Sequence, residues 1–233
     1  MIKKIWITGA SSGIGKALAI KFANEGWQVA ASARREKLLK DLNEQNSNIH
    51  SFPLDVKNET ETKNTFQNII KEFDNVDIAV FCTGMHDPDS EIKLNSEKIR
   101  EIMETNFFGT LNCIMAVNNY FRDKKRGHIS IVSSVAGYRG LPAASGYCAS
   151  KSALTSLAES LYFDFKRHNV RVSLVSPGFI KTPMTDKNKF PMPMIKSPEF
   201  AAEKMFIGLT KKNAFEIHFP IAFTMMMKLL KIM

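Results

Sequence analysis

Short apolar runs alternate with longer amphipathic segments along the chain. The runs that predict strands are Ile5–Ile7, Gln28–Arg35, Ile49–Val56, Val76–Gly84, Gly127–Ser134 and Val170–Pro183, the last of them running into a turn. Between them lie segments with apolar residues at helical spacing, such as residues 59–73 and the long segment that Tyr147 opens. Strands that alternate with helices of this length predict one α/β domain over residues 1–233, built on a doubly wound parallel sheet with helices on both faces.

A glycine-rich turn separates the first predicted strand from the first helix. Its spacing is G-x-x-x-G-x-G, which differs from the G-x-G-x-x-G of other dinucleotide folds. Glycines permit a tight turn and a close approach of the backbone, and the N–H groups at a helix start favour a pyrophosphate. An ordinary loop is the alternative for the glycines alone, but their position predicts a Rossmann-type nucleotide site. The residues of this turn assigned to a cofactor are Gly9, Ser11, Ser12, Gly13, Ile14 and Gly15.

The end of the second predicted strand carries arginines where an NAD site would offer a carboxylate. That position holds Ala33, followed by Arg34 and Arg35. Without the carboxylate there is no acceptor for the ribose 2′-OH and no repulsion of a 2′-phosphate, which a guanidinium such as that of Arg34 can bind. The alternative is a pair of surface arginines that start the next helix. We expect NADP(H) to be preferred over NAD(H).

A hydroxyl, a phenol and an ammonium are predicted to meet at one place. Tyr147 and Lys151 are four residues apart at the start of the long helix, so they share one helix face, and Ser134 ends a predicted strand at the edge where α/β sheets bind ligands. An ammonium beside the phenol favours the phenolate and is expected to lower the pKa of Tyr147, which makes Tyr147 a candidate general acid/base. An ordinary surface pair is the alternative for this spacing by itself.

These motifs resemble those of the short-chain dehydrogenases/reductases, in their compact single-domain branch. Residues 8–15 look like the family's TGxxxGIG motif, and Asn106, Ser134, Tyr147 and Lys151 match its catalytic set. The resemblance implies that Tyr147 transfers the proton, that Ser134 positions the substrate oxygen, that Lys151 lowers the Tyr147 pKa and binds the nicotinamide ribose, and that Asn106 helps to hold a water. The further cofactor contacts that it implies are Asp55, Val56, Cys82, Thr83, Gly84, Pro177, Gly178, Ile180 and Thr182, beside Tyr147 and Lys151.

Two departures from the family pattern affect these expectations. Cys82 stands where the family usually has an asparagine that ties neighbouring strands together, which puts the local rigidity in question. Many tetrameric members close with a strand and a glycine-rich tail, whereas here residues 214–220 lead into an apolar segment with two lysines, residues 220–233. That segment is too short to span a membrane; packing on the body, a dimer contact and a membrane surface are the alternatives for it.

Composition narrows the remaining function classes. The 233 residues carry a net charge of +9, but the basic residues are spread out and do not alternate with aromatic ones, so no nucleic-acid partner is expected. Solvated helix faces account for this charge, with an anionic cofactor or a membrane surface as the alternative. The cysteines, Cys82, Cys113 and Cys148, form no metal-binding cluster and suit a reducing compartment, so we expect no metal and a cytoplasmic protein, with membrane association as the variant.

Together these patterns predict an NADP(H)-dependent oxidoreductase that reduces a ketone or aldehyde to an alcohol, or catalyses the reverse. Residues 183–197, rich in Pro, Met and Lys, are expected to form a substrate lid, which favours an apolar small-molecule substrate. A homo-oligomer, dimer or tetramer, is expected. The alternatives from other classes are a non-catalytic NADP-binding regulator and an epimerase or dehydratase on the same scaffold.

Overall fold

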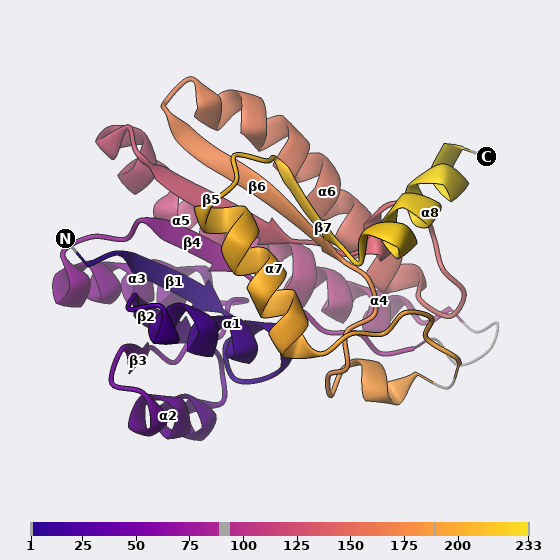
Figure 1. Ribbon diagram of the computed structural model, residues 1–233, viewed down its shortest axis with the longest axis horizontal. Helices are drawn as coiled ribbons and strands as arrows, with labels where there is room; N and C mark the ends of the chain where they lie inside the picture. The colour runs from indigo at the N-terminus through magenta and orange to yellow at the C-terminus, as the bar shows by residue number, and fades with distance from the viewer. Residues whose placement is uncertain (1, 89–93, 189, 233) are drawn as a thin grey trace.

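A seven-stranded parallel sheet forms the centre of the molecule. The computed structural model describes residues 2–88, 94–188 and 190–232. Within them the strands are β1 (Lys4–Thr8), β2 (Gln28–Ser32), β3 (Ile49–Ser51), β4 (Ile78–Phe81), β5 (Gly127–Val132), β6 (Val170–Pro177) and β7 (Glu216–Phe219). Their order is β3-β2-β1-β4-β5-β6-β7, and every pair is parallel (Figure 1). The predicted doubly wound α/β fold is confirmed.

Helices cover both faces of this sheet. They are α1 (Gly13–Asn24), α2 (Glu36–Gln45), α3 (Glu59–Phe73), α4 (Ser96–Met103), α5 (Gly109–Lys124), α6 (Ser145–Lys166), α7 (Pro198–Thr210) and α8 (Ile221–Ile232), with short helical turns η1 (Glu104–Phe108), η2 (Val135–Gly137) and η3 (Thr185–Lys187). Helices α1, α2 and α7 contribute to one apolar cluster, and α3, α5 and α6 to the other.

The alternation of side chains along each strand divides the core into these two clusters. In β1, Ile5 and Ile7 belong to the cluster on one face, and Trp6, which lies between them, belongs to the cluster on the opposite face. All three side chains are fully buried. A strand that is buried on both faces needs a continuous apolar run, which is why the sequence of β1 shows no polar alternation.

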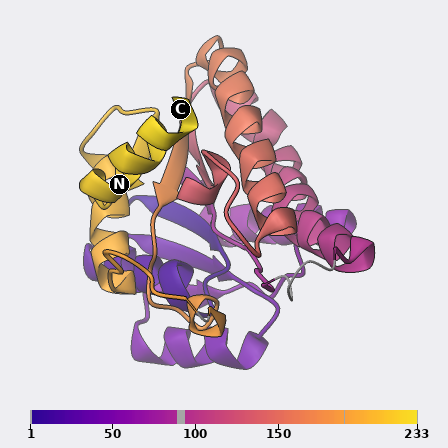
Figure 2. The ribbon, with the colours of Figure 1, turned by 90° about the vertical axis from the view of Figure 1, so that its right-hand side faces the viewer.

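Several strands end earlier than the sequence predicted. Strand β2 stops at Ser32, β5 at Val132 and β6 at Pro177, so the residues that follow them lie in loops at the carboxyl edge of the sheet. Figure 2 looks toward the side of the molecule that carries these loops. Because the strands are shorter, Arg34, Ser134 and Gly178 lie in these loops, where they are accessible to a ligand at the carboxyl edge of the sheet.

The sequence showed residues 214–220 as a lead into the apolar tail and did not reveal a strand there. Glu216–Phe219 form β7, which pairs with β6 from Leu174 to Pro177. The strand was missed because it has only four residues, of which Ile217 and Phe219 alone are buried. It leads directly into α8, so the tail is a helix attached to the sheet edge.

The described residues contain no helix that is long and apolar enough to cross a membrane. Of the expected lid (183–197) and tail (220–233), Lys189 and Met233 lie outside the described residues.

Candidate active site

A cleft opens at the carboxyl edge of the sheet, and every residue that the sequence assigned to the cofactor lines it. The loops after β1, β2, β3, β4 and β6 contribute to its walls, and so does the start of α6. The strand order reverses between β1 and β4, and ligands of open α/β sheets bind at such a reversal. Whether these residues contact a cofactor stays a prediction.

The glycines of the first turn leave room only for backbone. Gly9 has a φ of +71°, and a Cβ there would lie 2.9 Å from the backbone of Cys82 and Thr83. A Cβ on Gly15 would lie 2.3 Å from the carbonyl oxygen of Gly9, so the start of α1 can approach the turn only as glycine. Gly13 has a φ of +55°, and a Cβ there would lie 3.0 Å from Cγ2 of Thr182 in the loop after β6. This tight cradle at a helix N-terminus fits the diphosphate of a dinucleotide.

The side chain of Arg35 is hydrogen-bonded to two serines of this turn. Its guanidinium donates to Ser11 Oγ at 2.8 Å and to Ser12 Oγ at 2.6 Å. Arg34 lies beside it in the lining of the cleft and is exposed. The sequence named Arg34 as the residue that binds the phosphate, whereas the structure places the charge of Arg35 directly at the turn.

The hydroxyl, the phenol and the ammonium come together as predicted from their spacing. Ser134 follows β5, while Tyr147 and Lys151 both lie in the first two turns of α6, and all three line the cleft. Lys151 Nζ is 5.6 Å from the centroid of the Tyr147 ring and donates to the carbonyl oxygen of Val132 at 2.9 Å. Lys151 is buried, and its hydrogen bond to Val132 holds the ammonium on the side of β5.

The expectation that Lys151 lowers the pKa of Tyr147 was wrong for the polypeptide by itself. Burial raises the pKa of the Tyr147 hydroxyl to about 12, although its hydrogen bond with Ser134 acts in the opposite direction. Burial also lowers the pKa of the Lys151 ammonium to about 8. The prediction considered the attraction between the two charges without subtracting the cost of their desolvation. Because both groups are buried, desolvation has the larger effect on their pKa values.

Asn106 lies in a π-helical turn, η1, and its side chain is fully buried. Its amide donates to the carbonyl oxygen of Met85 and to Ser150 Oγ, both at 3.0 Å, and its Oδ1 accepts from the Met85 N–H at 2.7 Å. Asn106 therefore fixes the segment after β4 against α6. Both amide hydrogens are used within the protein, and its part in holding a water stays a prediction.

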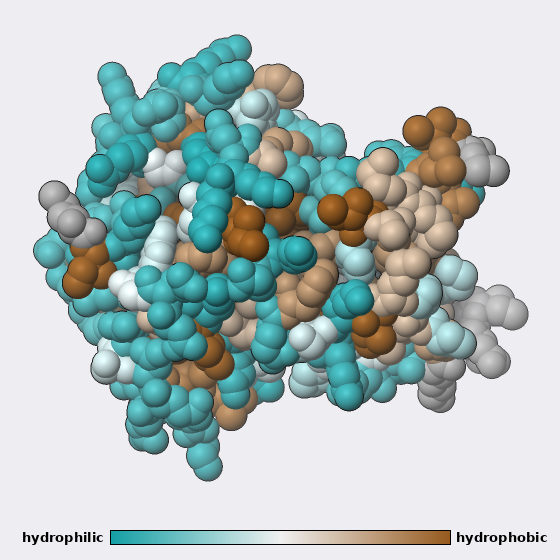
Figure 3. All heavy atoms as spheres, in the orientation of Figure 1, coloured by the Kyte–Doolittle hydropathy of each residue, from teal (hydrophilic) through white to brown (hydrophobic). Residues whose placement is uncertain are grey.

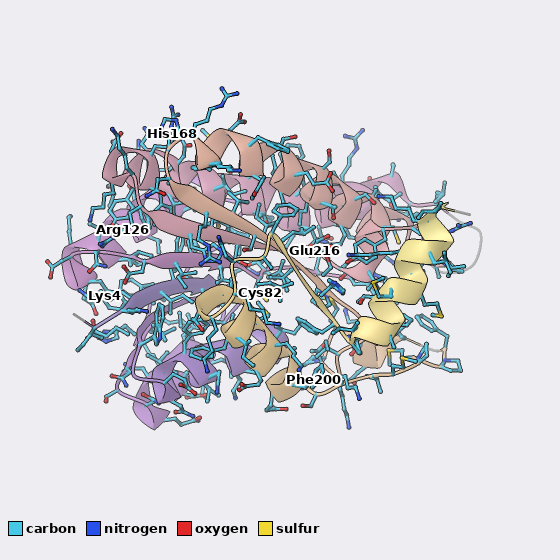
Figure 4. All side chains as sticks on the ribbon, turned by 45° about the horizontal axis from the view of Figure 1, so that its top comes forward. Lys4, Cys82, Arg126, His168, Phe200 and Glu216 are labelled. Atoms are coloured by element: carbon cyan, nitrogen blue, oxygen red, sulfur yellow. The ribbon has the colours of Figure 1, made fainter. Side chains whose placement is uncertain are left out.

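Cys82, which Figure 4 labels, replaces the family asparagine without loss of a link between the strands. Its backbone N–H donates to Thr8 Oγ1 at 3.2 Å, which connects the end of β4 to the end of β1. Burial raises the pKa of the Cys82 thiol to about 11, although the charge of Lys151 acts in the opposite direction, so burial disfavours the thiolate. The backbone of Cys82 lies against Gly9, and whether Cys82 contacts a cofactor stays a prediction.

A second, mostly apolar pocket adjoins the cleft, and the sequence did not reveal it as a unit. Its lining residues are His86, Ser134, Val135, Ala136, Leu141, Pro142, Ala144, Tyr147, Gly178, Phe179, Met184, Thr185, Asn188 and Phe190. The ring of His86 lies 4.8 Å from the ring of Tyr147, centroid to centroid. The one available signal for His86 was its position two residues after Gly84, at the carboxyl edge of β4. In the described part of the chain, no group of side chains is suited to hold a metal ion.

Comparison with known proteins agrees with this geometry. Residues 3–191 match the family model described as short chain dehydrogenase. An uncharacterized oxidoreductase of Myxococcus xanthus (strain DK1622) is 35% identical over 218 residues, covering 92% of this chain and 86% of that protein. A 3-oxoacyl-(acyl-carrier-protein) reductase FabG of Thermotoga maritima is 30% identical over 185 residues, covering 78% of this chain and 75% of that protein. A solved structure described as ElxO with NADP bound has a TM-score of 0.84 at 25% identity, covering 94% of this chain and 98% of that chain.

The chain therefore belongs to the short-chain dehydrogenase/reductase family and is an oxidoreductase of that family.

Proposed function

We propose that the protein uses NADP(H) to interconvert a carbonyl compound and the corresponding alcohol. The observation that carries this proposal is the position of Ser134 and Tyr147, which line both the cofactor cleft and the adjoining apolar pocket. A substrate oxygen in that pocket can reach both hydroxyls and still lie next to a nicotinamide in the cleft. The ElxO structure with NADP and the reductase from Thermotoga maritima support this reading of the site.

The nicotinamide, when bound, supplies or accepts the hydride. Tyr147 gives its proton to the substrate oxygen during reduction, and the raised pKa of about 12 keeps this proton in place at neutral pH. Ser134, hydrogen-bonded with Tyr147, orients the oxygen for that transfer. The Lys151 ammonium, held by the Val132 carbonyl, faces the cleft from the same helix and binds the ribose hydroxyls.

The preference for NADP(H) is supported by the charges around the turn. Arg34 and Arg35 both line the cleft at the end of β2, and Asp55 is the acidic residue of the lining. Asp55 Oδ1 accepts from the Lys57 N–H at 3.1 Å, which is a local contact in its own loop. A 2′-phosphate placed at the arginines meets two positive charges.

The substrate is an apolar carbonyl compound, because the pocket is walled by Leu141, Phe179, Met184 and Phe190. Two of these residues, Met184 and Phe190, come from residues 183–197, so this segment acts as the lid. A backbone hydrogen bond connects this segment to the loop after β6: the N–H of Lys181 donates to the carbonyl oxygen of Lys196 at 2.8 Å. A homo-oligomer stays a prediction.

The experiment is to follow NADPH oxidation with a panel of aldehydes, ketones and a 3-oxoacyl thioester, with NADH in parallel. Turnover with NADPH that exceeds turnover with NADH, and that falls in Ser134→Ala while NADPH binding persists, is the expected result. Tight NADPH binding without turnover of any member of the panel would contradict the proposal and favour the non-catalytic regulator.

A further inference from the structure

The exposed side of α8 is mostly apolar, whereas a surface helix usually turns polar residues toward the solvent. Thr224 is fully buried, and Lys228 reaches inward to the Glu216 carboxylate, its Nζ lying 2.5 Å from Oε2. Figure 4 labels Glu216 on β7, the strand from which α8 continues. The exposed residues of α8 are Ile221, Ala222, Met225, Met226, Leu229, Leu230, Lys231 and Ile232, and Lys231 is the charged one among them. A helix that buries Phe223 and Met227 against the body and still exposes a second apolar side indicates a covering that is not water.

This apolar side continues into the lid. The ring of Phe179 lies 5.4 Å from that of Phe223 in α8 and 5.9 Å from that of Phe190 in the lid, centroid to centroid. Phe190, Met194 and Ile195 of the lid are exposed. Among the described residues, nine of the fifteen exposed large hydrophobic side chains lie from Phe190 onward, so the exposure is concentrated here. We call these lid residues, together with the outward side of α8, the apolar face (Figure 3).

The charged residues that accompany the apolar face are mainly lysines. Between Phe179 and the end of α8, leaving out α7 and β7 with the loop between them, the described charged residues are Lys181, Asp186, Lys187, Lys196, Lys228 and Lys231. Helix α8 itself contains no acidic residue. Lys228 is paired with Glu216, whereas Lys181, Lys187, Lys196 and Lys231 are exposed. An apolar helix surface with exposed lysines around it has the composition of a helix that lies in a membrane interface, where anionic lipids attract the lysines.

We propose that the apolar face docks on an anionic lipid bilayer, with α8 lying in the plane of the interface. A second copy of the chain fits less well, because a twofold contact through this face would bring two sets of lysines together. The twelve residues of α8 are enough to lie in the interface and too few to span it. The ion pair between Lys228 and Glu216 keeps the helix on the body, so docking buries the outward side and leaves the fold unchanged.

Docking in this way brings the substrate pocket to the lipid. Phe179 and Phe190 line the pocket and also connect it to the apolar face. An amphipathic carbonyl lipid can therefore enter from the bilayer surface with its apolar part leading along these rings. This route rests on the proposed function, whereas the docking itself does not.

The test is flotation of the full chain with phosphatidylcholine vesicles, with and without phosphatidylserine. The variant Met225→Glu/Leu229→Glu places two charges on adjacent turns of the outward side of α8. The matched control is Ile2→Glu/Leu38→Glu, which makes the same charge change at exposed apolar positions in the part of the molecule opposite α8 (Figure 1). Circular dichroism and NADPH binding check that all three proteins are folded.

The expected result is that the wild type and the control float with the phosphatidylserine vesicles, and bind more weakly without phosphatidylserine. The α8 variant should lose about tenfold or more in partition coefficient. Its turnover of a short, water-soluble carbonyl compound should stay at the wild-type value, while its turnover of a long-chain ketone dissolved in the vesicles should fall.

Equal flotation of the wild type and the α8 variant, or no flotation of the wild type, would overturn the proposal. So would a wild-type dimer, measured by light scattering, that becomes a monomer in the α8 variant, because a second copy then covers the face. Flotation without turnover of any carbonyl compound would leave the docking standing and contradict the proposed function alone.

Discussion

The two halves of the site recognise their ligands in different ways. The cofactor half is built from backbone: Gly9 and Gly15 leave no room for side chains, and the turn presents N–H groups. The substrate half is built from side chains, with Phe179 and Phe190 in its wall and Phe223 of α8 packed behind them. A backbone cradle fits one kind of ligand, a diphosphate, whereas an apolar wall sets only the size and polarity of its ligand. The difference explains why this site supports a specific cofactor proposal and a broad substrate class.

Tyr147 lies where the two halves meet. A change at Tyr147 should therefore distinguish an effect on turnover from an effect on cofactor binding most clearly. Tyr147→Phe is expected to lower kcat by about 10²–10⁴-fold, because the substrate oxygen loses its proton donor, while NADPH binding stays the same. Steady-state rates together with the fluorescence of bound NADPH measure the two effects. Tyr162→Phe, a control in the same helix, should behave as the wild type. Unchanged turnover in Tyr147→Phe would show that another group transfers the proton.

In the cofactor half, the charge of Arg35 at the glycine-rich turn should distinguish NADPH from NADH. Arg35→Ala is expected to raise the KM for NADPH by about tenfold to a hundredfold and to leave the KM for NADH nearly unchanged, since only NADPH offers a 2′-phosphate. Arg126→Ala, whose side chain is 72% exposed, is the matched control. An equal rise for both cofactors would mean that Arg35 only supports the turn through Ser11 and Ser12.

The residues that the sequence assigned to the cofactor come together in one cleft because the sequence signals are local. The spacing of Gly9, Gly13 and Gly15, the separation of Tyr147 from Lys151 and the alternation of strands and helices are each contained in a short stretch. Short separations fix backbone geometry, so these patterns carry over directly into the fold.

The substrate half was not predictable in the same way, because it depends on contacts between distant segments. His86 meets Tyr147 across 61 positions of the chain, and the polarity of α8 is set by which side packs on Tyr138 and Phe179. The pKa of Tyr147 was also mispredicted, since spacing gives the neighbouring charge but not the burial. Strand β7, with only four residues, gave too short a pattern to be recognised.

The burial of Lys151 should lower the stability of the protein. Replacing Lys151 tests how large this loss of stability is. Its folded pKa of about 8 lies below the ordinary value of about 10.4, so between these values the unfolded chain binds more protons and stability rises with pH. Lys151→Met should remove this rise, increase the free energy of unfolding at neutral pH by about 1–4 kcal/mol and abolish turnover. Denaturant unfolding at about three pH values between pH 7 and pH 10 measures how the free energy of unfolding changes with pH. Lys166→Met, at an exposed site in the same helix, should change neither. A less stable Lys151→Met would show that the protein stabilises this ammonium.

Glu216 should produce the smallest effect, and it tests how α8 is attached to the substrate half. Burial raises the pKa of this carboxyl, but hydrogen bonds from Lys228, Tyr138 and Ser176 outweigh burial and hold the pKa below its ordinary value. A lowered folded pKa contributes stability that is present above the unfolded value, about 4.3, and is lost as the pH falls through the folded value. Glu216→Gln should therefore lower the free energy of unfolding at neutral pH by about 1 kcal/mol and flatten its decline in acid.

Thermal unfolding at neutral and acidic pH compares this variant with Glu203→Gln, which alters a pair with Lys21 in which the Glu203 side chain is 49% exposed. An exposed pair of this kind contributes little, so the control should follow the wild type. If Glu216→Gln declined in acid as steeply as the wild type, the ion pair would have no part in holding the apolar face in place. The attachment of α8 would then rest on the burial of Phe223 and Met227 and on the contact between Thr224 and His218.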